Sequence, residues 1–169
     1  MSGHSKWSQI RHKKAITDKK RGQIFSRLSR LITLAAKKGI DPKSNPSLAQ
    51  AIENAKAMNV PNENIERAIK KVSEKDQAQL EELSIEALGP GGVALKIKAI
   101  TDNRNRTMAE IKKILTENNS KLVQPGSLTW MFNQPLTLND SSLQGQVDKL
   151  FEALDDQDEI EDVNSNLAE

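Results

Sequence analysis

The fold is decided by residues 83–99, which read LSIEALGPGGVALKIKA. Apolar and polar residues alternate on both sides of residues 89–92, and a period of two is typical of half-buried β-strands. The Gly-Pro-Gly-Gly run between them has the residues of a tight connection, so we expect a hairpin. It does not have the pattern of a phosphate-binding loop, because no Gly-Lys-Ser/Thr follows and no helix is expected there.

Upstream of this hairpin, the hydrophobic period becomes that of helices. Apolar residues recur every three or four positions over 17–38, over 46–58 and over 61–72, which predicts three amphipathic helices. Asn45 followed by Pro46 has the residues of a helix cap and first turn. Because each helix is apolar on one face and the connections are short, we expect a small three-helix bundle.

Downstream of the hairpin, helix and strand patterns alternate. Thr107 and Glu110 match a capping box, which predicts a helix that starts at Thr107. We expect a third strand over 127–132, a helix over 141–154 and a last strand over 160–163. The order β-β-α-β-α-β predicts an α+β layer.

The predicted architecture is therefore an α+β fold in which an N-terminal three-helix bundle is followed by a ferredoxin-like antiparallel sheet with helices on one face. The polar run 73–79 reads as a linker. It divides the chain into a basic helical domain over 1–75 and an α+β domain over 76–169.

Positive charge is concentrated at the N-terminus. The first forty residues hold eleven Lys and Arg against one Asp, and residues 134–169 hold one Lys against ten Asp and Glu, although the whole chain is only +2. Lys and Arg release counterions from phosphates, so this segregation predicts a polyanion ligand. We interpret residues 3–16 as a flexible arm that exposes its charge, with Trp7 stacking on a base or anchoring the arm. The alternative is a solvated charged end with Trp7 docked on the bundle.

The candidate nucleic-acid-binding residues are basic side chains of the arm and the first long helix, one aromatic and two arginines of a later turn: Lys6, Trp7, Arg11, Lys13, Lys14, Lys20, Arg21, Arg104 and Arg106. The two arginines belong to a strand-to-helix turn, where backbone N–H groups can hold a phosphate. From the residues alone we favour the alternative that Asp102 and Asn103 shape this turn and cap the helix.

Composition argues against several other classes of protein. There is no Cys, which removes disulfides, thiolate catalysis and Cys-based zinc sites. His4 and His12 lack the neighbours of a metal site, and no activated nucleophile or tuned acid-base pair is evident. We therefore expect no enzyme activity, metal, cofactor or small-molecule substrate. No run approaches the roughly 20 apolar residues that span a bilayer, and no secretory signal is present, so we expect a cytoplasmic protein without a membrane partner.

Four features carry a family resemblance: the sequence GHSKW at 3–7, the long basic helix, the sequence GPGG at 89–92 and the sequence DNRNRT at 102–107. In this order and spacing, the chain resembles the YebC/PmpR family of transcriptional regulatory proteins, whose relatives include the mitochondrial translational activator of cytochrome c oxidase. Members of this family carry a third α+β domain inserted within the second. Because only residues 134–140 join position 132 to the last helix, we expect a short form without that insert.

The resemblance implies a cytosolic, non-enzymatic and DNA-binding regulator of transcription. Ribosomal RNA is the alternative ligand, because a basic arm suits it equally well and bacterial relatives are linked to ribosomes stalled on proline-rich stretches. The corresponding function is that of a ribosome-associated translation factor. A second alternative is a protein-interaction module that uses the acidic C-terminal helix.

Overall fold

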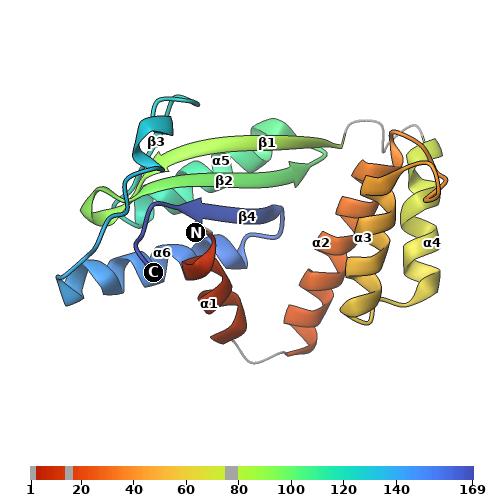
Figure 1. The fold of residues 1–169 in the computed structure, drawn as a ribbon, viewed down its shortest axis with the longest axis horizontal. Coiled ribbons are helices and arrows are strands. Elements are labelled where there is room, and N and C mark those ends of the chain that lie inside the picture. Colours follow the sequence, from red (N-terminus) through yellow and green to blue (C-terminus); the bar gives the residue numbers. More distant parts are fainter. Residues whose placement is uncertain (1–2, 14–16, 75–79) are drawn as a thin grey trace. The chain divides into compact units, whose positions relative to one another are not determined.

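The computed structural model describes residues 3–13, 17–74 and 80–169, with the side chains of residues 12 and 13 outside that description. The chain forms two compact units. Residues 1–15 and 82–169 form an α+β unit, and residues 16–81 form a helical unit (Figure 1). The helical unit is thus inserted between the first helix and the first strand of the α+β unit.

The helical unit is the predicted three-helix bundle. It consists of α2 (Asp18–Ala36), α3 (Pro46–Ala57) and α4 (Asn62–Lys70), followed by the 3-10 turn η1 (Lys71–Ser73). The side chain of Asn45 caps α3 by accepting a hydrogen bond from the backbone N–H of Leu48 at 3.2 Å, as its position before Pro46 predicts. Apolar residues of the three helices and of the connection between α3 and α4 meet in one core: Ile32, Ala36, Leu48, Ala55, Val60, Ile65 and Ala68.

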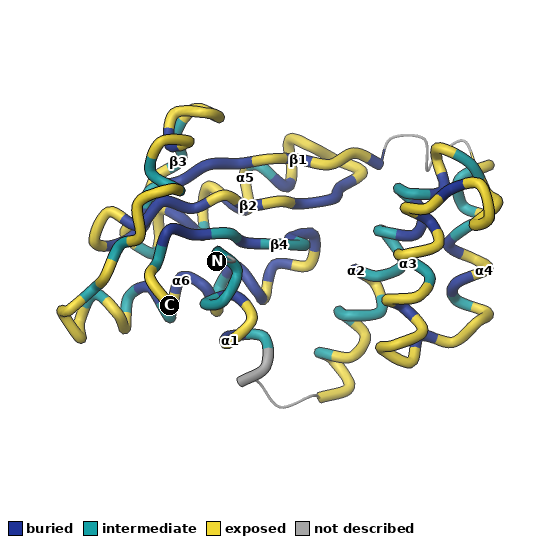
Figure 2. The backbone as a smooth tube through the Cα atoms, in the orientation of Figure 1, coloured by how far each residue is buried: buried dark blue, intermediate teal, exposed yellow. Residues whose placement is uncertain are grey.

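The α+β unit is built on a four-stranded antiparallel sheet in the order β3-β1-β2-β4. Its strands are β1 (Glu81–Leu88), β2 (Ala94–Thr101), β3 (Lys121–Val123) and β4 (Ile160–Ser165). Along β2, buried positions are interrupted by the exposed Lys96 and Lys98 (Figure 2). This alternation leaves one face of the strand polar and turns the other toward the core.

Two long helices cover the apolar face of the sheet: α5 (Arg104–Glu117) and α6 (Ser141–Asp156). Their buried side chains, such as Leu115 and Phe151, share one core with Ile85 of β1 and Ile97 of β2. The predicted α+β class, the order of the elements and the coverage of one sheet face are all confirmed.

The connection between β1 and β2 is the expected hairpin. The backbone N–H of Gly89 donates to the carbonyl of Val93 at 2.8 Å, and Pro90–Gly92 form a 3-10 turn, η3. Gly91 has a φ of +71°, and a Cβ added there would lie 2.8 Å from the side chain of Leu138. Only glycine meets both conditions without strain.

Two local predictions are wrong. The segment 127–132 is not a strand, because the buried carboxylate of Glu86 accepts hydrogen bonds from the backbone N–H groups of Gly126 and Leu128 and holds the chain in a turn. The third strand lies earlier, at β3, and the 3-10 turn η4 (Thr129–Met131) follows. The fifth helix begins at Arg104 instead of Thr107, since the side chain of Asn103 caps it.

The third difference concerns the N-terminal arm. Residues 5–13 form the helix α1 (Ser5–Lys13), which contacts α6 and β4. Trp7 and Ile10 are 2% and 3% exposed and belong to the core of the α+β unit. The contacts of this segment group it with the α+β unit, because Trp7 and Ile10 belong to the core of that unit, whereas the division expected from the sequence assigned it to a helical domain over 1–75.

Candidate nucleic-acid interface

The residues just before α1 fasten it to the edge strand β4. The carbonyl of Gly3 accepts a hydrogen bond from the backbone N–H of Ser165 at 2.8 Å. A Cβ on Gly3 would lie 2.5 Å from the backbone carbonyl oxygen of Ser165 as well as 1.7 Å from Oδ1 of Asn164, and because the backbone cannot move aside, glycine is required for this approach. Nε2 of His4 lies 2.6 Å from Oδ2 of Asp162 on the same strand. The GHSKW segment thus has a structural role that its basic character did not indicate.

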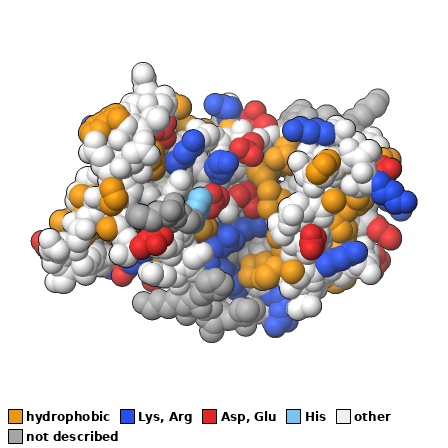
Figure 3. All heavy atoms as spheres, in the orientation of Figure 1, with side chains coloured by type: hydrophobic (Ala, Val, Ile, Leu, Met, Phe, Trp, Pro, Cys, Tyr) orange, Lys and Arg blue, Asp and Glu red, His pale blue; other side chains and the backbone are white. Residues whose placement is uncertain are grey.

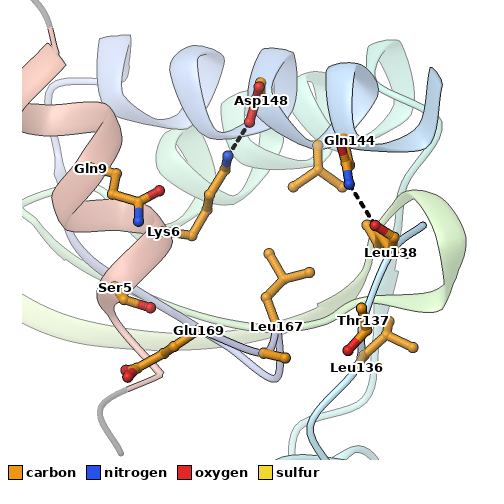
Figure 4. Close-up of a pocket in the computed structure, with 12 residues that line it drawn as sticks. Ser5, Lys6, Gln9, Leu136, Thr137, Leu138, Gln144, Asp148, Leu167 and Glu169 are labelled. Atoms are coloured by element: carbon orange, nitrogen blue, oxygen red, sulfur yellow. Dashed lines mark hydrogen bonds and ion pairs between the residues drawn. The ribbon is translucent and has the colours of Figure 1, made fainter. Parts of the chain in front are cut away.

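The described cations of α1 face acids of α6. Lys6 forms an ion pair with Asp148 (Figure 4). Nε of Arg11 lies 3.7 Å from Oδ1 of Asp155, whose side chain is completely buried. Since these cations neutralise carboxylates of their own unit, they add little to the positive potential that a polyanion would meet.

Trp7 is an anchor in this arrangement. Its ring centroid lies 6.4 Å from that of Phe151 at an angle of 54°, and the guanidinium of Arg11 lies 5.3 Å from its centroid. Such tilted aromatic and cation–π contacts add to the gain from burying a large apolar side chain. At 2% exposure, the ring has no face left on which a base could stack.

A pocket of about 330 Å³ lies beside the pair formed by Lys6 and Asp148. Figure 4 shows Lys6 and Gln9 of α1 on one side and the residues around Leu138 and Leu167 on the other. Its described lining residues include the carboxylates of Asp148 and Glu169 as well as the ammonium of Lys6. Because both signs of charge meet there, this pocket does not favour a polyanion.

The arginines predicted at the start of α5 have different environments. Arg106 donates to Asp102 at 2.9 Å and to Glu159 at 2.6 Å. These hydrogen bonds, first to Glu159 and then to Asp102, raise the pKa of Arg106. Arg106 therefore ties the turn to the connection between α6 and β4, as expected if this motif shapes the turn. Arg104 is exposed in the first turn of the helix.

The remaining described candidates, Lys20 and Arg21, lie in the first turn of α2 in the helical unit. Arg21 is exposed and lies 3.4 Å from the fully exposed Asp18, a kind of surface pair that contributes little binding energy. Nζ of Lys20 lies 3.4 Å from Oε1 of Gln23. Both cations stand close to the positive end of the helix dipole, so they reinforce its potential.

Charge is divided unequally between the two units. The helical unit holds thirteen Lys and Arg against eight Asp and Glu, and the α+β unit holds twelve against fifteen. Their net charges are therefore +5 and −3. On the face drawn in Figure 3, basic side chains of the helical unit are interspersed with acidic and hydrophobic ones. The charge excess thus belongs to the helical unit as a whole.

The structure divides the predicted residues into three groups. Lys6, Trp7 and Arg11 come together on α1, Arg104 and Arg106 on α5, and Lys20 and Arg21 on α2. The side chain of Lys13, and Lys14 as a whole, lie outside the described residues.

Sequence reasoning missed the acids that pair with α1. Asp148 and Asp155 are seven residues apart in α6 and hence on one face, but the helix predicted over 141–154 ended one residue before Asp155.

Among the described residues, no group of three His, Asp or Glu side chains is arranged to hold a metal ion. No helix in the described part of the chain has both the length and the apolar character needed to cross a membrane.

Two family models match consecutive parts of the chain. The model of the TACO1/YebC protein N-terminal domain matches residues 5–75, and that of the TACO1/YebC second and third domain matches residues 80–136. A crystal structure of a conserved hypothetical protein from Aquifex aeolicus is similar, with a TM-score of 0.86 and 30% identity over 97% of both chains.

Curated relatives carry one recurring name. A "probable transcriptional regulatory protein" of Prosthecochloris aestuarii is 54% identical over 136 residues, which cover 79% of this chain and 54% of the relative. One from Chlorobium phaeobacteroides is 46% identical over 170 residues, covering 99% of this chain and 68% of the relative. The chain spans about half the length of several of these relatives. On these matches, the chain belongs to the YebC/TACO1 family.

Proposed function

We propose that this protein is a non-enzymatic, nucleic-acid-binding regulator of gene expression that acts in the cytoplasm, with DNA as the favoured ligand. The name that its relatives share, probable transcriptional regulatory protein, supports regulation as the general role. The helical unit would supply most of the phosphate contacts. Arg104 and the side chains of Lys13 and Lys14 remain further candidates.

The observation that carries this assignment is the division of charge. The helical unit is net +5 and the α+β unit net −3, and the acids of α6 face the described cations of α1. A phosphate backbone is attracted to the unit whose cations exceed its acids. The polyanion-binding character that the first forty residues suggested is therefore assigned to α2 and its bundle.

The first turn of α2 illustrates this assignment. Acidic side chains stabilise a helix N-terminus and basic ones oppose its dipole, yet Lys19, Lys20 and Arg21 follow Asp18 there. This arrangement stabilises the helix poorly. It does create a local positive potential suited to phosphate oxygens.

Two alternatives predict other ligands. Phosphate contacts position a protein without reading bases, so ribosomal RNA and a role in translation fit the same surface. A protein-interaction module that uses the acidic α6 has less support, because Asp148 and Asp155 already face Lys6 and Arg11 of the same unit.

The test is crosslinking in cells followed by sequencing of the recovered nucleic acid. Recovery of specific genomic fragments is expected for the full chain. Recovery should fall when Lys19, Lys20 and Arg21 are replaced by Gln, and it should persist when Lys96 and Lys98 of the sheet are replaced instead. Enrichment of ribosomal RNA would favour a role in translation over a role in transcription. Recovery at the level of an uncrosslinked control would overturn nucleic-acid binding.

A further inference from the structure

A second pocket, of about 300 Å³, lies within the helical unit. It is lined by residues of α2, of α4 with its following turn, and by one residue that precedes β1: Phe25, Ser26, Ser29, Arg30, Thr33, Asn64, Lys71 and Leu80. All of these residues belong to the same compact unit. The pocket is therefore a property of the bundle itself.

Helical spacing explains why polar side chains converge there. Ser26, Ser29, Arg30 and Thr33 occupy positions i, i+3, i+4 and i+7 of α2, which share one helix face. This stripe lies beside the apolar one that forms the bundle core.

A buried hydrogen bond fixes the two walls of the pocket. Oγ1 of Thr33 donates to the backbone carbonyl of Ala68 in α4 at 2.8 Å. Asn64 and Lys71 lie about one turn before and after this contact, and both line the pocket together with the polar stripe of α2. The pocket is thus preformed by helix packing.

The chemistry of the lining favours an anion. It supplies the guanidinium of Arg30, the ammonium of Lys71, the hydroxyls of Ser26 and Ser29 and the side-chain amide of Asn64, and its described residues include no Asp or Glu. A guanidinium binds two oxygens of one phosphate, and an ammonium adds a point charge. The first pocket differs, since carboxylates line it together with Lys6.

The apolar members of the lining strengthen this preference. Phe25 and Leu80 form parts of the wall, and Leu80 is buried. Walls of low polarity concentrate the field of the neighbouring cations and strengthen hydrogen bonds made inside the pocket.

We infer that this pocket binds a phosphate group through Arg30, Lys71 and the polar stripe of α2. The phosphate belongs either to a nucleic-acid backbone, in which case the inference rests on the proposed function, or to a free phosphorylated small molecule. Both sources present the same oxygens to the same donors.

The test is a titration of the ¹⁵N-labelled full chain with inorganic phosphate. NMR chemical shifts of the backbone amides report binding, and NaCl keeps the ionic strength constant. Saturable shifts are expected at residues 26–33 and 64–71. Lys71→Gln should weaken the apparent affinity about tenfold, the cost of one charge-assisted hydrogen bond. The matched control is Lys70→Gln, which removes an exposed charge outside the lining and should change the affinity less than about twofold.

A second variant works by repulsion. Ser26→Asp places a carboxylate on the exposed rim and should abolish the phosphate shifts, while circular dichroism verifies that the helices persist. Shifts that never saturate, or that weaken equally in Lys70→Gln and Lys71→Gln, would overturn the phosphate pocket.

The same spectra separate the two sources. Displacement of phosphate by a duplex oligonucleotide assigns the pocket to the nucleic-acid backbone. Binding of a nucleoside monophosphate at these residues, with no response to the duplex, assigns it to a free phosphorylated ligand. Duplex binding that is undiminished while the phosphate shifts fail to appear would overturn the pocket and leave the proposed function standing.

Discussion

The two basic helices at the start of the chain look alike in sequence and differ in the fold. In α1, Lys6 and Arg11 face Asp148 and Asp155 of α6. In the first turn of α2, Arg21 lies 3.4 Å from the fully exposed Asp18, and Nζ of Lys20 lies 3.4 Å from Oε1 of Gln23. A run of positive charge therefore predicts a polyanion surface only where the fold brings no acids against it.

Apolar residues decide which of the two helices is covered. Trp7 and Ile10 bury one face of α1 in the core of the α+β unit. This docking places the neighbouring Lys6 and Arg11 against α6. The apolar stripe of α2, which includes Ile32, packs into the core of the helical bundle instead. Four substitutions test this difference between α1 and α2, and their expected effects decrease in the order given.

Trp7→Ala should cost about 3–5 kcal/mol in the free energy of unfolding, because it empties a large buried site next to Phe151. Urea denaturation measures this change. Trp130→Ala is the matched control, since Trp130 is 62% exposed and its loss should change stability by no more than about 0.5 kcal/mol. Equal effects of the two changes would contradict the anchoring of α1.

Gly3→Ala should destabilise the protein by about 1–3 kcal/mol, because the added Cβ overpacks against Asn164 and the backbone of Ser165. Thermal unfolding measures the loss. Hydrogen exchange should show faster opening at the end of β4. A neutral Gly3→Ala variant would mean that the close approach at β4 is not required.

Arg106→Gln should cost about 1–2 kcal/mol, because buried Glu159 loses its cation but keeps the hydroxyl of Thr107 at 2.9 Å, and because Arg106 is partly screened by solvent. The folded-state pKa of Arg106 is raised, so its contribution is present below the unfolded pKa and is lost only as the pH rises through the folded value. Urea denaturation between about pH 6 and 10 should therefore show a constant difference from the native chain. A difference that vanishes within this range would contradict the pairing.

Gly22→Ala should have the smallest effect and the opposite sign. A Cβ at Gly22 in α2 meets no atom within 4 Å, and removing glycine from a helix interior stabilises it by about 0.5–1 kcal/mol. Thermal unfolding measures the gain. Destabilisation would indicate that this face of α2 is packed.

Most of the fold could be predicted from the sequence because local signals agree with the tertiary structure. The alternation around 83–99, the cap at Asn45 and the stripe of α2 each specify an element that tertiary packing then uses. The predicted strand over 127–132 was wrong because a distant side chain, Glu86, takes the backbone hydrogen bonds of that segment. A pairing over about forty residues leaves no local pattern.

The candidate site could be predicted only in part. Counts of Lys and Arg identified a basic end, but the docking of α1 depends on contacts between residues some 140 positions apart, such as Lys6 and Asp148. The polar stripe of α2 was readable in the spacing of Ser26, Ser29 and Arg30. Its significance appeared only when Lys71 was placed opposite it.

Phosphate binding by the helical unit is tested most directly by the salt dependence of duplex binding in two matched double variants. Lys20→Gln with Arg21→Gln should lower the slope of log K against log salt concentration by about 1.8, or about 0.9 for each lost contact. Lys6→Gln with Arg11→Gln removes the same charge from α1 and should leave the slope unchanged. The opposite result, a lower slope for the α1 variant alone, would contradict the assignment of phosphate binding to the helical unit.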